Sequence, residues 1–176
     1  MDTEKIEWFL RGNWAPLSEE KELNDLKVDG SIPTELDGIY VRTGPNPKDG
    51  KGSHWFLGDG MVHGIRLKKG KAEWYRNRFV QTPDITEPLT DPMAGLGDLR
   101  RGKGNTHVVA HNEQIMCLEE AHWPWTINAD LETTGVLNYE GKLDCSMTAH
   151  PKVCPVTGEL LAFSYFSFEQ PHLKYI

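Results

Sequence analysis

The chain has 176 residues and a formal net charge of −7, from 26 acidic and 19 basic side chains. That length allows one domain with a real core, and the acidic balance argues against a nucleic-acid partner, because phosphate binding needs a cationic surface. No stretch approaches the roughly 20 apolar residues of a transmembrane helix, residues 1–13 are unlike a signal peptide, and three widely spaced cysteines favour free thiols, so we expect a cytoplasmic protein.

Short runs of aromatic and β-branched residues, separated by glycine and proline, predict an all-β chain. Near the start, Ser18–Leu23 predicts one capped helical turn. The hairpins that follow have the spacing of propeller blades, although no exact internal repeat is present. Strands are predicted over residues 38–42, 61–67, 72–80, 106–110, 114–119 and 143–148, with a final apolar run at 160–163.

Two features between these strands stand out. Gly58, Asp59 and Gly60 predict a tight turn with positive φ, in which Asp59 accepts hydrogen bonds from local backbone N–H groups. Residues 85–104, rich in glycine and proline, predict a long loop that is first interpreted as a solvated surface excursion. Because scattered leucine and methionine side chains lie beside basic residues in this loop, peripheral membrane contact is a second interpretation.

The segment around His150 predicts a histidine held at the lip of a β-hairpin. Pro151 biases the backbone of His150 towards an extended conformation, and residues 155–158 form a turn signal before the apolar run. Cys145, His150 and Cys154 also have ligand-type side chains, so a small zinc-binding protein is an alternative. A structural zinc site needs a fourth ligand, and none stands at a usual spacing.

Several motifs, taken together and in order, resemble the carotenoid cleavage oxygenases, a family that includes apocarotenoid and stilbene cleavers and the retinal pigment epithelium isomerase. The resemblance runs from about Gly12 to Tyr175. It implies a seven-bladed β-propeller, of which residues 1–176 would be the amino-terminal part of a single domain, with only the early blades, long loops and little helix. The motifs are residues 44–47, 54–63, 75–78, 105–109, 131–135 and 148–159.

The same resemblance implies an iron site. Members of the family hold Fe(2+) with four histidines, the first in an Ala-His-Pro motif that matches Ala149-His150-Pro151, so His150 is the predicted iron ligand. Imidazole suits iron and leaves positions for dioxygen. The implied reaction adds both atoms of dioxygen across one carbon–carbon double bond of an apolar conjugated substrate and releases two carbonyl products, without an organic cofactor.

Glu120 is the predicted carboxylate partner of the His150 ring, because a ligating histidine usually donates its other N–H to such a group. Glu119 should point to the opposite face of the strand. In the stilbene cleavers the position of Glu119 is often a lysine that meets a phenolic oxygen, so the acidic residue argues against a phenolate substrate. Cys154 stands where the family usually has aspartate.

One histidine cannot hold a catalytic metal ion alone. The family's other three histidine ligands lie in later blades, so without those carboxy-terminal blades the isolated chain is expected to be inactive and of low stability. The competing hypothesis is a complete, non-catalytic β module. Trp123 and Trp125 would line either a core or a substrate tunnel. Structural or surface roles are expected for His54, His63, His107, His111, His122 and His172.

Overall fold

In the computed structural model, which describes residues 6–167 and 170–176, antiparallel strands dominate. Within those ranges the α-helix is limited to α1 (Pro83–Thr86). Short 3-10 turns make up the rest of the helical structure, which confirms the prediction of an all-β chain with little helix. They are η1 (Trp8–Leu10), η2 (Gly12–Trp14), η3 (Trp55–Leu57), η4 (Pro92–Gly95) and η5 (Leu99–Arg101).

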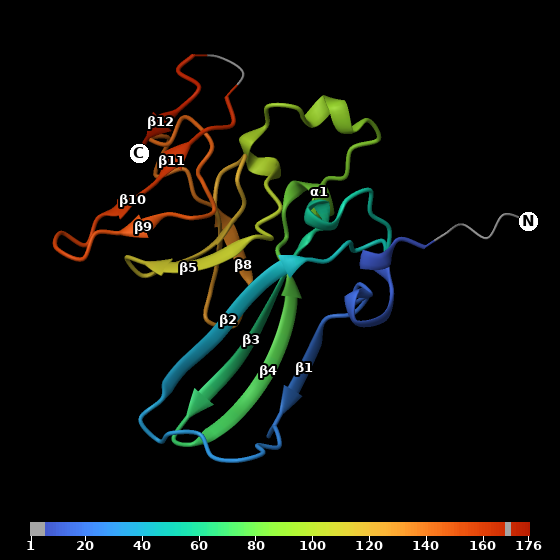
Figure 1. Cartoon of the computed structure of the whole chain (residues 1–176), viewed down its shortest axis with the longest axis vertical. Coiled ribbons are helices and arrows are strands. Elements are labelled where there is room, and N and C mark those ends of the chain that lie inside the picture. Colours follow the sequence, from blue (N-terminus) through green and yellow to red (C-terminus); the bar gives the residue numbers. More distant parts are fainter. Residues whose placement is uncertain (1–5, 168–169) are drawn as a thin grey trace, which may run out of the picture.

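The first sheet has four antiparallel strands in the order β1-β4-β3-β2 (Figure 1). The predicted strand and hairpin are confirmed as β2, β3 and β4. Lys69 and Gly70 close the β3–β4 hairpin, and both have positive φ, as a two-residue turn that matches the strand twist requires. The strands are β1 (Lys21–Asn24), β2 (Asp37–Pro45), β3 (Gly60–Lys68) and β4 (Lys71–Phe79).

The helical turn predicted from Ser18 is wrong, because residues 21–24 form β1 and pair with β4. The buried side chain of Asn77 explains the extended conformation, since its amide accepts from the Lys21 N–H at 2.7 Å and donates to the Glu19 carbonyl at 3.0 Å. Glu22 adds an ion pair with Arg76 at 3.0 Å. Tertiary contacts thus override a weak local helix signal.

The second sheet has the order β5-β6-β7-β8 and contains the predicted second hairpin. Two short pairs follow it, β10 with β9 and β11 with β12, and β10 and β11 together hold three of the four residues in the predicted final apolar run. The strands are β5 (His107–His111), β6 (Gln114–Leu118), β7 (Trp125–Ile127), β8 (Thr133–Val136), β9 (Lys152–Val153), β10 (Leu160–Leu161), β11 (Phe163–Ser164) and β12 (Lys174–Tyr175).

The strand predicted over 143–148 is also wrong. Its groups bond to separate segments in place of one ladder: the Met147 N–H donates to the His122 carbonyl at 3.1 Å, and the Thr148 N–H donates to the Phe163 carbonyl at 2.9 Å. The buried segment therefore threads between elements and ends at the site described below.

The two sheets pack against each other through one apolar core. Val62 comes from the first sheet, while Cys117, Trp125 and Ile127 come from the second. Leu131, fully buried between β7 and β8, contacts the backbone at Gly64, where a Cβ would come within 2.8 Å of its Cδ1. Two four-stranded antiparallel sheets packed in this way are the arrangement of neighbouring propeller blades.

Neither Gly58 nor Gly60 has a positive φ, so that prediction is wrong at both positions. Glycine is required there because other parts of the chain lie too close to leave room for a Cβ atom. A Cβ on Gly58 would lie 2.7 Å from the Pro47 ring, and one on Gly60 would lie 2.1 Å from the Lys103 carbonyl oxygen. Asp59 does accept from a backbone N–H, that of Lys48, at 2.9 Å. The motif therefore joins the start of β3 to the 85–104 loop.

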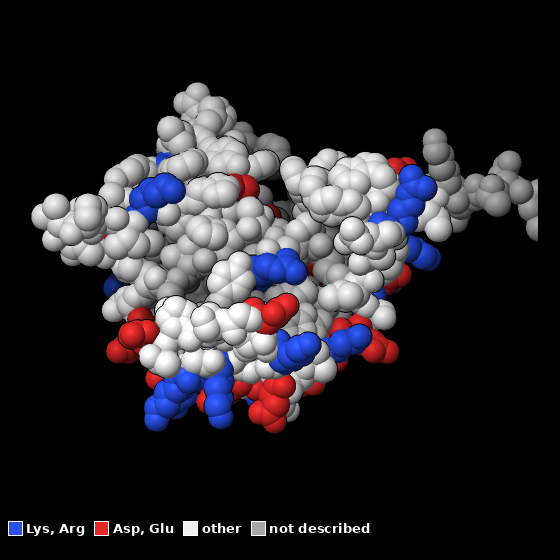
Figure 2. Space-filling model, turned by 60° about the horizontal axis from the view of Figure 1, so that its bottom comes forward, with Lys and Arg blue, Asp and Glu red and all other residues white. Residues whose placement is uncertain are grey.

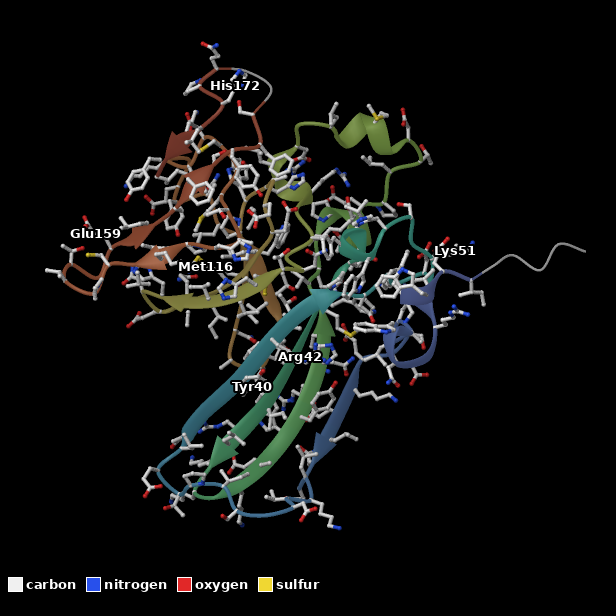
Figure 3. All side chains as sticks on the ribbon, viewed as in Figure 1. Tyr40, Arg42, Lys51, Met116, Glu159 and His172 are labelled. Carbon is white, nitrogen blue, oxygen red and sulfur yellow. The ribbon has the colours of Figure 1, made fainter. Side chains whose placement is uncertain are left out.

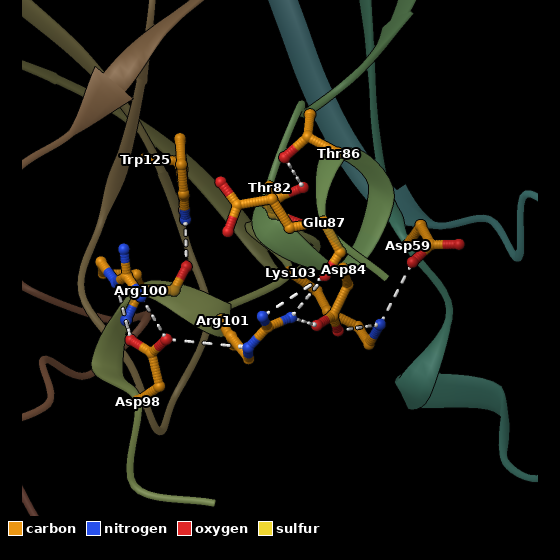
Figure 4. A network of polar contacts seen from close by, with 10 residues as sticks. All are labelled: Asp59, Thr82, Asp84, Thr86, Glu87, Asp98, Arg100, Arg101, Lys103 and Trp125. Atoms are coloured by element: carbon orange, nitrogen blue, oxygen red, sulfur yellow. Dashed lines mark hydrogen bonds and ion pairs between the residues drawn. The ribbon is translucent and has the colours of Figure 1, made fainter. Parts of the chain in front are cut away.

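Residues 85–104 form a long loop without strands, as predicted, although it contains the short turns η4 and η5 and the end of α1. A polar network holds the loop against the first sheet (Figure 4). The Lys103 ammonium contacts Asp84 at 2.8 Å and Asp59 at 3.1 Å, and Arg101 contacts Asp84 at 3.2 Å. Burial lowers the pKa of Lys103, but the two carboxylates outweigh it and raise that pKa above its usual value. Arg100 contacts Asp98 at 2.8 Å, so all three basic side chains of the loop have carboxylate partners, while Met93 is 67% exposed.

The surface carries charges of both signs close together. In Figure 2, basic and acidic side chains lie beside one another along the lower part of the molecule, and the upper part is largely uncharged. Residues 6–167 and 170–176 contain no helix that could span a membrane.

Candidate functional site

His150 and Glu120 lie together at one end of the second sheet. His150 Nε2 is 3.0 Å from Glu120 Oε1, and the histidine side chain is 61% exposed whereas that of the glutamate is 24% exposed. Glu120 follows β6, and His150 precedes β9. The two sequence-predicted site residues are therefore in contact, 30 positions apart in the chain.

Glu120 also holds the backbone that carries His150. Its Oε2 accepts from Thr148 Oγ1 at 3.0 Å and from the Ala149 N–H at 3.1 Å. Thr148 Oγ1 in turn accepts from the His150 N–H at 3.1 Å. One carboxylate thus contacts both the main chain and the imidazole ring. When Nε2 carries the proton that Glu120 accepts, the other ring nitrogen, Nδ1, carries a lone pair.

A second histidine, His107, lies beside this pair. Its Nδ1 is 2.7 Å from the Ala149 carbonyl oxygen, and its ring centroid is 6.0 Å from that of His150 with 29° between the ring planes. The sequence predicted a structural or surface role for His107 and did not place it beside His150. The available signal was its place in the hairpin register opposite Leu118, two residues before Glu120.

Tyr165 adds a phenol near the carboxylate. Partial burial raises the pKa of Tyr165, and hydrogen bonding to Glu120 raises it further.

Glu119 points elsewhere, as expected for neighbours on an extended chain. Its Oε1 is 2.5 Å from His122 Nδ1 and accepts from the Ala121 N–H at 2.9 Å. Glu119 and His122 line a cavity of about 560 Å³ together with Lys103 and apolar loop side chains such as Leu96. The two adjacent glutamates therefore have different partners, His122 for Glu119 and His150 for Glu120.

The zinc alternative gains no support from the positions of its residues. Cys145 interacts with Ser164 and Asp144, whereas Cys154 Sγ accepts from the Thr157 N–H at 3.5 Å. Across residues 6–167 and 170–176, no group of three or more His, Cys, Asp or Glu side chains could hold a metal ion.

The other predicted positions have local partners. Trp125 packs in the core, with its Nε1 donating to the Arg100 carbonyl at 3.0 Å. His54 accepts from the Phe56 N–H, His111 contacts the Gly158 carbonyl, and His172 contacts the Ser167 carbonyl.

His63 is partly buried in the first sheet, where its Nδ1 is 2.8 Å from the Tyr75 hydroxyl. Burial lowers the pKa of His63 from 6.5 to about 4, and the charge of Arg42, which extends from β2 beside Tyr40 (Figure 3), adds to the effect. Its ring is therefore neutral in the folded chain at neutral pH.

This pKa predicts a pH dependence of stability. As the pH is lowered from 6.5 to about 4, His63 becomes protonated in the unfolded chain but not in the folded chain. The free energy of unfolding should therefore fall as the pH falls, on the order of 1 kcal/mol over this interval after allowance for partial exposure. Urea unfolding at several pH values measures this slope. His63→Gln should flatten it, and an unchanged slope in that variant would show that other groups cause it.

The chain was compared with known proteins. The sequence model of the family described as retinal pigment epithelial membrane protein matches residues 14–176. A carotenoid cleavage oxygenase of Mycobacterium tuberculosis is 43% identical over 172 residues, which cover 93% of this chain and 34% of that protein. Carotenoid 9,10(9',10')-cleavage dioxygenase 1 of Arabidopsis thaliana is 38% identical over 202 residues, covering 95% of this chain and 37% of that protein.

Solved structures agree with these relatives. The crystal structure of Pseudomonas brassicacearum lignostilbene dioxygenase matches 89% of this chain and 36% of its own with a TM-score of 0.76 and 32% identity. A cobalt-substituted Synechocystis ACO matches 86% of this chain and 38% of its own, with a TM-score of 0.69 and 24% identity, which shows the shared fold. The chain spans about a third of the length of the relatives it matches. It belongs to the family of the retinal pigment epithelial membrane protein and the carotenoid cleavage oxygenases.

Proposed function

We propose that this chain contributes one iron ligand, His150, to a non-haem Fe(2+) dioxygenase that cleaves a carbon–carbon double bond to two carbonyl products. The observation that supports the proposal most is the contact of His150 Nε2 with Glu120 Oε1 at 3.0 Å, in the Ala-His-Pro segment. A ring that donates one N–H to a carboxylate is oriented, has a fixed tautomer and is more basic at its other nitrogen.

The residues present fit an iron ion as a partial site. An exposed imidazole with a carboxylate behind it is suitable donor chemistry for Fe(2+), which when bound activates dioxygen. Glu120 holds the imidazole proton at Nε2, and Thr148 and Ala149 keep the carboxylate in place. In this proposal the other three ligands belong to blades beyond residues 1–176, so this chain alone retains iron weakly and does not turn over substrate.

The proposed substrate is an apolar conjugated molecule of the carotenoid, apocarotenoid or stilbene type, together with dioxygen. The names of the relatives support this class. Within it we favour carotenoids and apocarotenoids over phenolates, because the resemblance places Glu119 where stilbene cleavers often have a lysine that meets a phenolic oxygen, and a carboxylate would repel a phenolate.

We also propose that the protein is cytoplasmic and that residues 85–104 contact a membrane surface. All three cysteines are free thiols, which suits a reducing compartment. Leu96 and Met93 are 68% and 67% exposed on the loop and could enter a lipid surface. Sedimentation with anionic liposomes tests the contact, and a chain that stays in the supernatant would exclude it.

The gene itself tests the proposal first. We expect the reading frame to continue past codon 176 and to encode further strand ends that carry histidine. A stop codon at that point, without a partner chain that supplies the other ligands, would contradict the proposal.

Metal analysis and oxygen uptake then test the chemistry. The 176-residue chain should hold little iron and consume no oxygen with an apocarotenoid or a stilbene, because it supplies one ligand. Stoichiometric iron with cleavage products from this chain alone would overturn the proposed division of ligands. Tight zinc that is lost in Cys145→Ser would overturn the iron assignment.

A further inference from the structure

One face of β5 docks the segment that carries His150. Residues 107, 109 and 111 alternate onto this face. His107 Nδ1 contacts the Ala149 carbonyl at 2.7 Å, and His111 Nε2 contacts the Gly158 carbonyl at 2.8 Å. Between them, Val109 packs in the cluster that includes Ala149. β5 thus contacts this segment at Ala149, just before β9, and at Gly158, in the turn between β9 and β10.

The two histidine contacts have a defined direction. A carbonyl oxygen can only accept a hydrogen bond, so His107 donates from Nδ1 and His111 donates from Nε2. His107 and His111 lie on the same strand, 4 positions apart, and each ring donates to a backbone carbonyl. They therefore form a natural pair for comparison, because only His107 acts next to the proposed ligand.

The Ala149 backbone is held from two sides. Its N–H donates to Glu120 Oε2 at 3.1 Å, and its carbonyl accepts from His107 at 2.7 Å. His107 is the first residue of β5 and pairs with Leu118, the last residue of β6, and Glu120 follows two residues later. The open end of the β5–β6 hairpin consequently presents a donor and an acceptor that match the two polar groups of one residue.

The His150 ring is bounded on two sides as well. Glu120 contacts its Nε2 edge, while the His107 ring lies towards its face, with 6.0 Å between centroids. The carbonyl that His107 holds belongs to the peptide bond between Ala149 and His150. That bond sets the direction in which the His150 side chain leaves the backbone.

We propose that His107 is a positioning residue, which fixes the orientation of His150 through its hydrogen bond to the Ala149 carbonyl. The inference deepens the proposed function, because its consequence is a preorganised metal ligand. It predicts that the donor at position 107 matters more than the ring. His107→Asn retains an N–H at the Nδ1 position, whereas His107→Phe retains a ring and removes the donor.

The test uses the metal-free 176-residue chain and NMR. We expect His107→Phe to accelerate exchange of the His150 amide hydrogen, which belongs to the peptide bond that His107 holds and donates to Thr148 Oγ1, about tenfold and to average the two ring-nitrogen signals of His150. His107→Asn should keep that exchange rate within about threefold of the parent. His111→Phe, the matched control on the same strand, should leave both His150 signals unchanged. Circular dichroism and the midpoint of thermal unfolding identify any variant that fails to fold.

Either of two results overturns the positioning role. If His107→Phe and His107→Asn change the His150 signals equally, the donor is not what matters. If neither variant changes them, His107 does not orient the ring. A loss equal to that of His107→Phe in His111→Phe would show general loosening of the hairpin, which also contradicts the inference.

A cobalt titration separates this inference from the proposed function. Co2+ should selectively broaden the NMR signals of His150, and His107→Phe should weaken that binding about tenfold while His107→Asn restores it. If Co2+ leaves His150 unchanged in the parent chain while the exchange results hold, His107 positions His150 and the metal assignment is wrong. If Co2+ broadens His150 equally in all variants, the metal assignment stands and the positioning role is wrong.

Discussion

Gly60→Ala is expected to lower the free energy of unfolding by roughly 3 kcal/mol or more. A Cβ at this position would lie 2.1 Å from the Lys103 carbonyl oxygen and 3.0 Å from that of Gly104. Both obstacles are backbone atoms, so relief requires the end of the 85–104 loop to move away from β3. That movement would strain the salt bridges of Lys103 with Asp59 and Asp84.

The matched control is Gly38→Ala, on β2 of the same sheet, where an added Cβ meets nothing within 4 Å. We expect that variant to stay within about 0.5 kcal/mol of the parent. Urea unfolding of both variants measures the difference. Equal stabilities for the two would show that the loop is not packed against β3 as described.

Replacing Glu120 has an effect that depends on the replacement. Glu120→Ala removes the acceptor for Thr148 Oγ1 and the Ala149 N–H and leaves them without this partner, which should lower the free energy of unfolding by about 2 kcal/mol. Glu120→Gln can turn its carbonyl oxygen towards the same two donors. It should therefore keep most of the stability, with a loss below about 1 kcal/mol.

Glu120→Gln should nevertheless alter His150. Once the amide oxygen faces Thr148 and Ala149, the amide NH2 group faces His150 Nε2, which must then accept. The imidazole proton moves to Nδ1, the opposite tautomer from that favoured by a carboxylate. Ring-nitrogen chemical shifts measure this exchange of tautomers. An unchanged tautomer in Glu120→Gln, or a fully stable Glu120→Ala, would show that the carboxylate does not hold this histidine.

The parts of the fold predicted from sequence are those with strong local patterns. Regular alternation and turn residues identified β2 to β6, because period and turn chemistry are local properties. β1 was missed because the buried amide of Asn77, more than 50 positions away, holds it extended. The segment 143–148 was assigned wrongly because its apolar residues are buried by several different elements, a situation that the sequence pattern does not distinguish from a strand.

The contacts around His150 could be predicted from sequence only in part. His150 and Glu120 followed from a resemblance in their motifs, and the structure brings them into contact. His107 was missed because its partner is a backbone carbonyl, which leaves no trace in residue types. Gly58 and Gly60 were interpreted through φ, although the crowding that demands them comes from Pro47 and the Lys103 carbonyl.

We propose above that His150, held by Glu120, is an iron ligand of a double-bond-cleaving dioxygenase. The most direct test measures iron per protein and cleavage of an apocarotenoid in the product of the complete reading frame, with His150→Ala compared with His111→Ala. We predict that His150→Ala loses bound iron and cleavage together, whereas His111→Ala retains both. Stoichiometric iron and undiminished cleavage in His150→Ala would contradict the claim.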